Sequence, residues 1–85
     1  MPEICRFYGI IIKMYFNEHN PPHFHTEYEG YKVTITIEAG ILEGKMPKRA
    51  LNLIFEWLEI HHEELMNNWI LIEELGEYSK IKPLE

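Results

Sequence analysis

Histidines are concentrated in one short segment of the chain. Residues 19–27 read His-Asn-Pro-Pro-His-Phe-His-Thr-Glu and hold three of the five histidines. Imidazole titrates near neutral pH, so two neighbouring histidines can accept and donate a proton within one reaction. Cleavage of RNA needs little more than this, because the ribose 2′-hydroxyl is itself the nucleophile. The segment therefore indicates general acid–base chemistry without a metal or a cofactor.

A β-hairpin is predicted directly after these histidines, and it determines which side chains share a face. Glycine supplies the positive φ of a tight two-residue turn, so Glu29-Gly30 is the expected turn. The register then pairs Tyr28 with Tyr31, Glu27 with Lys32, His25 with Thr34 and His23 with Thr36.

Because side chains alternate along a strand, this register predicts two unlike faces. The predicted core face carries Phe24, Thr26, Tyr28, Tyr31, Val33, Ile35 and Ile37. The other, which we call the polar face, carries His23, His25, Glu27, Lys32, Thr34 and Thr36.

The acid–base interpretation assigns a role to each ionisable group near this face. His25 is the expected general base or acid and His23 its counterpart, with Glu27 beside them. Lys32 or Arg6 is expected to stabilise the anionic, phosphorane-like state. His19 and Asn20, in the loop just upstream, are expected to bind the substrate.

Two other interpretations of the same residues stay open. A His-x-His pair on a strand points both rings the same way, so His23 and His25 could bind a divalent metal such as Zn²⁺, with His19 and Glu27 as further ligands. Alternatively, the histidines are solvated side chains on an exposed strand. Two prolines stiffen the loop that presents them, which favours a functional role.

A second candidate binding region combines a small basic patch with an aromatic side chain. Lys45, Lys48 and Arg49 cluster where a helix is expected to begin, and a helix N-terminus can bind phosphate. Tyr8 is a further candidate binding residue in the first strand. We interpret Trp57, Trp69, His61 and His62 as structural.

Composition excludes several classes of protein. The chain has 85 residues, a formal net charge of −6 and one cysteine, Cys5, so no intrachain disulfide can form. The negative charge argues against strong non-specific binding of nucleic acid. The longest apolar run, residues 10–12, is far short of the roughly 20 residues that span a bilayer. We expect a cytoplasmic protein without a signal peptide.

The expected architecture is one α+β domain over residues 1–85, built on a small antiparallel sheet of three to four strands. Strands are expected within about 5–43, where residues 6–16 read as one strand with Gly9 as a bulge. Helices are expected within about 47–75, where apolar residues recur at spacings of three and four. They form one long kinked helix or two helices that cover one face of the sheet, followed by an extended tail at 77–85.

Several segments together carry a resemblance to a known family. They are Met1–Ile10, Met14–Phe16, His19–His25, Gly44–Lys45, Pro47–Ala50, Glu56–Trp57, His61, Glu64–Leu65, Asn68–Trp69 and Ile81–Glu85. The chain resembles the DUF4160 family of short bacterial proteins, some of which are designated DhiT, the toxin of a type II toxin–antitoxin pair. The resemblance implies a bacterial protein that binds a small antitoxin-like protein encoded beside it. It assigns no reaction.

The leading hypothesis from sequence is therefore a toxin-like component of a bacterial toxin–antitoxin module that cleaves RNA without a metal. The alternatives are a non-catalytic protein-binding module paired with a neighbouring gene product, and a small metal-binding protein that uses His-x-His. The expected partners are the antitoxin-like protein and RNA, with a homodimer as a further possibility and no membrane.

Overall fold

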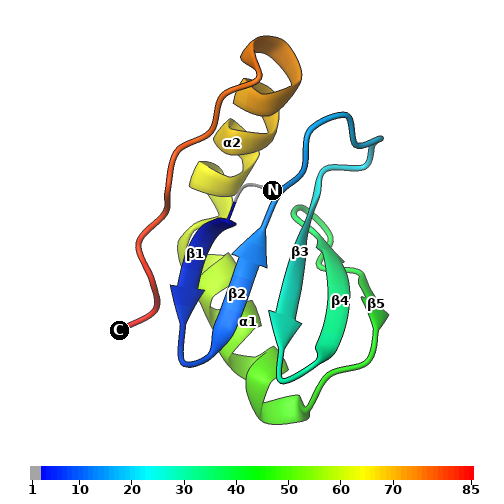
Figure 1. The fold of residues 1–85 in the computed structure, drawn as a ribbon, viewed down its shortest axis with the longest axis vertical. Coiled ribbons are helices and arrows are strands. Elements are labelled where there is room, and N and C mark those ends of the chain that lie inside the picture. The colour runs from blue at the N-terminus through cyan, green and yellow to red at the C-terminus, as the bar shows by residue number, and fades with distance from the viewer. Residues whose placement is uncertain (1–2) are drawn as a thin grey trace.

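An antiparallel sheet and two C-terminal helices make up the computed structural model, which describes residues 3–85 (Figure 1). The strands are β1 (Glu3–Phe7), β2 (Ile10–Lys13), β3 (His23–Tyr28), β4 (Tyr31–Thr36) and β5 (Leu42–Gly44), and the helices are α1 (Lys48–Ile60) and α2 (His62–Leu75). The strands pair in chain order, β1-β2-β3-β4-β5. The predicted α+β class is confirmed. The expected three to four strands were too few, because the described residues form five.

The additional strand arises where the sequence suggested one continuous strand with a bulge. Tyr8 and Gly9 form a two-residue turn with φ values of 49° and 81°, and β1 folds back on β2 so that Phe7 pairs with Ile10. Two positive φ angles match the twist of adjacent antiparallel strands. The expected strand over residues 6–16 is thus a hairpin, and Tyr8 lies exposed at its tip.

The β3–β4 hairpin has the predicted register. His23 pairs with Thr36, His25 with Thr34 and Glu27 with Lys32, across a turn at Glu29-Gly30. Core residues of this hairpin are buried as expected, namely Phe24, Thr26, Val33, Ile35 and Ile37. Tyr31 departs from the prediction, because it is exposed at the end of the sheet beyond the cover of the helices.

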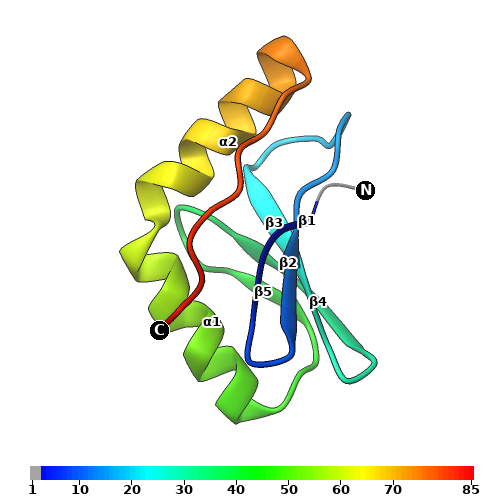
Figure 2. The same ribbon diagram turned by 60° about the vertical axis from the view of Figure 1, so that its left-hand side comes forward.

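Both helices lie on one side of the sheet, and the core fills the space between these two layers (Figure 2). Trp57 of α1 is fully buried, and its ring contacts Phe24 of β3 at a centroid distance of 6.1 Å. Helix α1 ends at Ile60 and α2 starts at His62, so the expected break in the helical region falls at His61. Gly76 ends α2 in a left-handed conformation.

The tail that follows α2 is extended, but it is held along the domain. The amide N–H of Ile81 donates to the carbonyl of Ile4 in β1 at 2.9 Å. The Trp57 indole N–H donates to the carbonyl of Lys82 at 2.8 Å. The buried side chain of Asn68 exchanges two hydrogen bonds with the backbone of Ser79, at 2.7 and 2.9 Å. These contacts fasten the tail to α1, α2 and β1.

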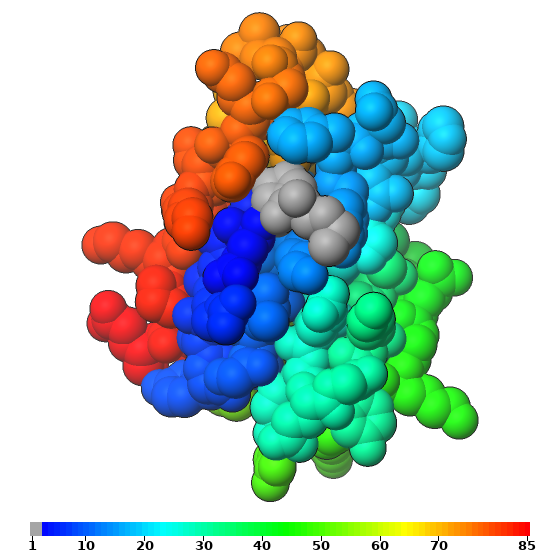
Figure 3. All heavy atoms as spheres, viewed as in Figure 1, coloured from blue at the N-terminus to red at the C-terminus, as the bar shows by residue number. Residues whose placement is uncertain are grey.

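One region of the molecule lies outside this sheet-and-helix arrangement. The loop between β2 and β3 extends beyond the sheet beside the end of α2, where Phe16 contacts Tyr78 at a ring-centroid distance of 6.5 Å (Figure 3). The loop thus lies next to the start of β3, the strand that carries His23 and His25. Within residues 3–85, neither helix has the length and apolar character that a membrane span requires.

Candidate functional site

Glu18, His23 and His25 converge at the end of the sheet where β3 begins, and we call them the His–Glu cluster. The Nε2 atom of His23 lies 3.2 Å from the Oε1 atom of Glu18, and the Nε2 atom of His25 contacts the same oxygen. The three potential ligand atoms all lie within 4.8 Å of one another. A single carboxylate oxygen therefore faces both imidazole rings.

The cluster is built from one strand and one loop. His23 and His25 are two residues apart on β3, so strand geometry points both rings to the polar face. Residues 14–22 form the loop that brings Glu18 back over this face. The loop has a cis peptide bond between Asn20 and Pro21, and the Pro22 carbonyl accepts a hydrogen bond from the Ile37 amide at 3.0 Å.

The ring of His23 is fixed from two sides. Its Nδ1 atom lies 2.8 Å from the backbone carbonyl oxygen of Pro21, which can only accept, so Nδ1 carries a hydrogen. The indole of Trp69 on α2 packs against the ring at a centroid distance of 5.3 Å. Trp69 is itself buried. The Nε2 atom of His23 is consequently the nitrogen that faces Glu18.

The ring of His25 has a different environment. Tyr15 contacts it edge-on, with ring centroids 4.5 Å apart and an interplanar angle of 90°. Across the sheet, His25 pairs with Lys13 of β2 on one side and Thr34 of β4 on the other. Lys13 thus places a cationic side chain directly beside His25 in the sheet.

Electrostatics keep the Glu18 carboxyl ionised. Partial burial opposes its ionisation, but the hydrogen bond from His25 and the charges of His25 and His23 outweigh that effect and lower its pKa. A carboxylate can only accept hydrogen bonds, so both rings must donate to it or share a cation with it. One carboxylate thus faces two imidazole rings that can each carry or release a proton.

A pocket of about 220 Å³ opens beside the cluster. Its walls combine loop and polar-face residues, namely His19, Asn20, Pro21, His23, Thr34, Thr36, Ile41 and Glu43. The structure therefore brings the predicted binding residues His19 and Asn20 next to His23. The walls carry hydroxyl, amide and imidazole groups, which can hydrogen-bond to a polar ligand.

Several predicted site residues are not brought to the two histidines. The Glu27 carboxylate accepts a hydrogen bond from the Lys13 ammonium at 2.9 Å, and its strand partner on the other side is Lys32. Arg6 on β1 is paired with Glu3, with a shortest N–O distance of 2.8 Å. In the register of the sheet, Arg6, Glu27 and Lys32 lie in the row through Ile11, two residue pairs beyond the row of His25.

The predicted metal-ligand set of His19, His23, His25 and Glu27 coincides only in His23 and His25 with the potential ligands that converge. Among residues 3–85, one group of three or more potential ligands converges, and its acidic member is Glu18 in place of Glu27. Glu27 is held by Lys13, and His19 lines the pocket without joining the three ligand atoms.

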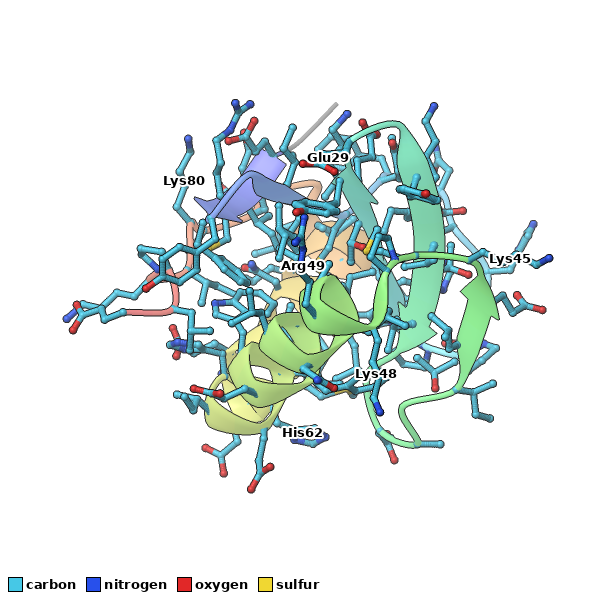
Figure 4. All side chains as sticks on the ribbon, turned by 90° about the horizontal axis from the view of Figure 1, so that it is seen from below. Glu29, Lys45, Lys48, Arg49, His62 and Lys80 are labelled. Atoms are coloured by element: carbon cyan, nitrogen blue, oxygen red, sulfur yellow. The ribbon has the colours of Figure 1, made fainter. Side chains whose placement is uncertain are left out.

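The predicted basic patch does not form one surface. Figure 4 shows the side chains of Lys45, Lys48 and Arg49 pointing in different directions from the start of α1 and the end of β5. The Arg49 guanidinium donates to the Tyr28 hydroxyl at 3.1 Å. Tyr8 and Arg49 instead line a separate pocket of about 380 Å³ between the β1–β2 turn and α1.

Sequence reasoning missed three residues of the site: Glu18, Tyr15 and Lys13. Lys13 belongs to the same row as His25, which only the β2–β3 register reveals. Glu18 and Tyr15 come from an irregular loop, and no periodic pattern predicts where such a loop folds. The one available signal was that Glu18 precedes His19 at the start of the proline-containing segment.

The fold and the cluster define a small α+β domain with a His–Glu site at one end of its sheet. Residues 9–70 match the family described as "Domain of unknown function (DUF4160)", and this chain belongs to that family. No curated protein and no solved structure is detectably similar to the chain.

Proposed function

We propose that this chain is the toxin-type component of a bacterial toxin–antitoxin pair and that it cleaves RNA by general acid–base catalysis. The observation that carries the catalytic part is the convergence of His23 and His25 on one carboxylate oxygen of Glu18 beside an open pocket. Base and acid are the two functions that transesterification at the 2′-hydroxyl requires. The chain belongs to the DUF4160 family, whose description states no function. The toxin role is what the sequence resemblance implies.

His25 is the general base in this proposal. Glu18 accepts a hydrogen bond from Nε2 of His25, so the lone pair of the neutral ring is on Nδ1. That nitrogen has no hydrogen-bond partner among the described residues. A carboxylate that holds one imidazole nitrogen and leaves the other basic is the arrangement used in hydrolase triads. Glu18 acts here as a positioning residue.

His23 is the general acid. Its Nδ1 hydrogen is committed to the Pro21 carbonyl, and a second hydrogen on Nε2 satisfies the contact with Glu18. A ring with both hydrogens is an imidazolium, which can give the Nε2 hydrogen to a leaving group. In the reaction, His25 removes the 2′-hydroxyl proton, the 2′-oxygen bonds to phosphorus, and His23 protonates the departing 5′-oxygen. The products are a 2′,3′-cyclic phosphate and a free 5′-hydroxyl.

Lys13 replaces Lys32 and Arg6 as the best candidate for stabilising the anionic transition state. It is the direct strand neighbour of His25, whereas Arg6 and Lys32 lie two residue pairs further along the sheet. Its ammonium also donates to Glu27 at 2.9 Å, so it would have to leave that carboxylate to reach a phosphate. The net charge of −6 makes RNA binding depend on such local cations. A basic surface on the antitoxin-like partner would complement the same negative charge. The proposal places both proteins in the bacterial cytoplasm.

The test is RNA cleavage by the purified chain in the presence of EDTA. A mixed-sequence, 5′-labelled RNA oligonucleotide should be cut to products that end in a 2′,3′-cyclic phosphate. The DNA oligonucleotide of the same sequence should stay intact, because it has no 2′-hydroxyl. His25→Gln and His23→Gln should each lower the rate by about 10²–10⁴-fold, the usual contribution of a general acid or base.

His62→Gln is the matched control, because this histidine is also partly buried but begins α2 and lies outside the cluster. It should cleave RNA at the native rate. Induction of the native chain in a bacterial host should arrest growth, and the two cluster variants should not. RNA left intact by the native chain, or cut equally well by folded His25→Gln, would refute the catalytic proposal.

A further inference from the structure

The donor atoms of the His–Glu cluster have the spacing of metal ligands. Two ligands bound at about 2.1 Å to a tetrahedral metal lie roughly 3.4 Å apart. The Nε2 atom of His23 and the Oε1 atom of Glu18 are separated by 3.2 Å, and His25 presents its Nε2 atom to the same oxygen. The three atoms lie within 4.8 Å of one another, and they can surround one ion once the ring of His25 moves back from Glu18.

The hydrogen bond from His23 to Pro21 strengthens this case independently. A histidine that binds a metal typically donates its other ring N–H to a backbone carbonyl or a carboxylate, which fixes the tautomer. Nδ1 of His23 makes such a bond to the Pro21 carbonyl at 2.8 Å. In the neutral ring, the lone pair on Nε2 then faces the Glu18 carboxylate. Two electron-rich atoms at this distance require a cation between them.

Either a proton or a metal ion can be that cation. We propose that Glu18, His23 and His25 bind one divalent transition-metal ion, with Zn²⁺ as the best match, in competition with the hydrogens on Nε2 of His23 and His25. Imidazole nitrogens select Zn²⁺ over Mg²⁺ and Ca²⁺, which prefer oxygen ligands. The set of two histidines and one glutamate also occurs in catalytic zinc sites, where a fourth position stays open.

Metal binding uses the same three side chains as the proposed RNA cleavage but does not depend on that activity. The ion would take the Nε2 lone pair of each histidine. His23 would then have no second proton to donate. Zn²⁺ should accordingly inhibit metal-independent cleavage, and EDTA should restore it. The cluster would have two exclusive states, one protonated and one metal-bound.

Isothermal titration with ZnCl₂ tests the site directly. The chain should be purified without a histidine tag and treated with EDTA, which is then removed. One Zn²⁺ should bind per chain, and the affinity should fall as the pH is lowered, because protons compete for the ligands. Glu18→Gln, His23→Gln and His25→Gln should each weaken binding by at least tenfold, since changes even to groups around a metal cost 10–100-fold.

Two matched controls separate this site from surface binding. Glu59→Gln changes an exposed carboxylate on α1, and His62→Gln changes the first residue of α2. Both should bind Zn²⁺ with native affinity, and circular dichroism should show that every variant is folded. As a second measurement, Co²⁺ should give the visible absorption of a low-symmetry site with the native chain and lose it in the three cluster variants.

Absence of Zn²⁺ binding by the native chain would overturn the inference. Native Zn²⁺ affinity in all three cluster variants would also overturn it. A loss of Zn²⁺ binding in His62→Gln would overturn it as well, because the ion would then be bound at α2. The two proposals fail separately. Zn²⁺ binding with intact RNA refutes only the cleavage proposal, whereas RNA cleavage without Zn²⁺ binding refutes only the metal site.

Discussion

Lys13 and Glu27 form an ion pair across β2 and β3, with 2.9 Å between the Lys13 Nζ atom and the Glu27 Oε2 atom. The two residues are offset by two residue pairs along the strands, because Lys13 pairs with His25 and Glu27 pairs with Ile11. The diagonal contact draws the Lys13 ammonium toward Glu27. It also occupies Glu27, so Glu18 is the carboxylate left to the histidines.

Glu27→Gln should destabilise the protein in a pH-dependent way. The hydrogen bond from Lys13 is the main cause of the lowered pKa of the Glu27 carboxyl in the folded state. A lowered folded-state pKa adds stability that is complete above the unfolded value of about 4.3 and is lost as the pH falls through the folded value. Urea unfolding should therefore separate the variant from the native chain at pH 7, with a smaller difference at pH 3. An equal difference at both pH values would contradict this assignment.

Asn68→Ala should loosen the tail. The Asn68 amide is buried and exchanges two hydrogen bonds with the Ser79 backbone. Ser79 is exposed, so water can solvate its freed backbone groups, and the loss is that of two hydrogen bonds at about 0.5–1.5 kcal/mol each. Urea unfolding should show this loss. Hydrogen exchange of the Ser79 and Ile81 amides should accelerate more than exchange in β3. Unchanged protection of the tail would mean that Asn68 does not hold it.

Gly44→Ala should be more damaging than Gly30→Ala. Both glycines have positive φ, 109° and 87°, so alanine is strained at either position. A Cβ atom on Gly44 would lie 2.6 Å from the Lys32 carbonyl oxygen, whereas nothing lies within 4 Å of one on Gly30. We expect a loss of about 1–2 kcal/mol for Gly30→Ala from strain alone. Gly44→Ala should lose more, because β5 must move away from β4. Equal midpoints in urea would exclude the clash.

The sequence was most informative where one regular pattern extended over many residues. Alternation on both sides of Glu29-Gly30 predicted the β3–β4 register, and with it the shared face of His23 and His25. Regular spacing of apolar residues predicted the helical region within about 47–75. In each case short-range geometry alone decides which side chains are neighbours.

The sequence was least informative where contacts depend on how distant segments meet. Tyr8 is an unusual residue for a left-handed turn position, so the sequence did not reveal the turn between β1 and β2. Residues 6–16 therefore read as one strand. Glu18 reaches the histidines through an irregular loop whose path no local rule determines. Likewise, the tail is attached by hydrogen bonds from Asn68 to Ser79 and from Ile81 to Ile4. These bonds join segments that are distant in sequence, so no local pattern predicts them.

The pairing of all five strands in chain order has a consequence for how the domain folds. Each strand pairs with the next one along the chain, and the longest connection is the loop of residues 14–22, so the sheet can assemble by successive hairpin closures, each with a modest entropic cost. Proteins whose contacts are mostly local in sequence fold faster than those built on long-range pairing. The slowest step should then be the docking of α1 and α2 onto a preformed sheet. The scaffold that holds His23 and His25 would exist before the core closes behind it.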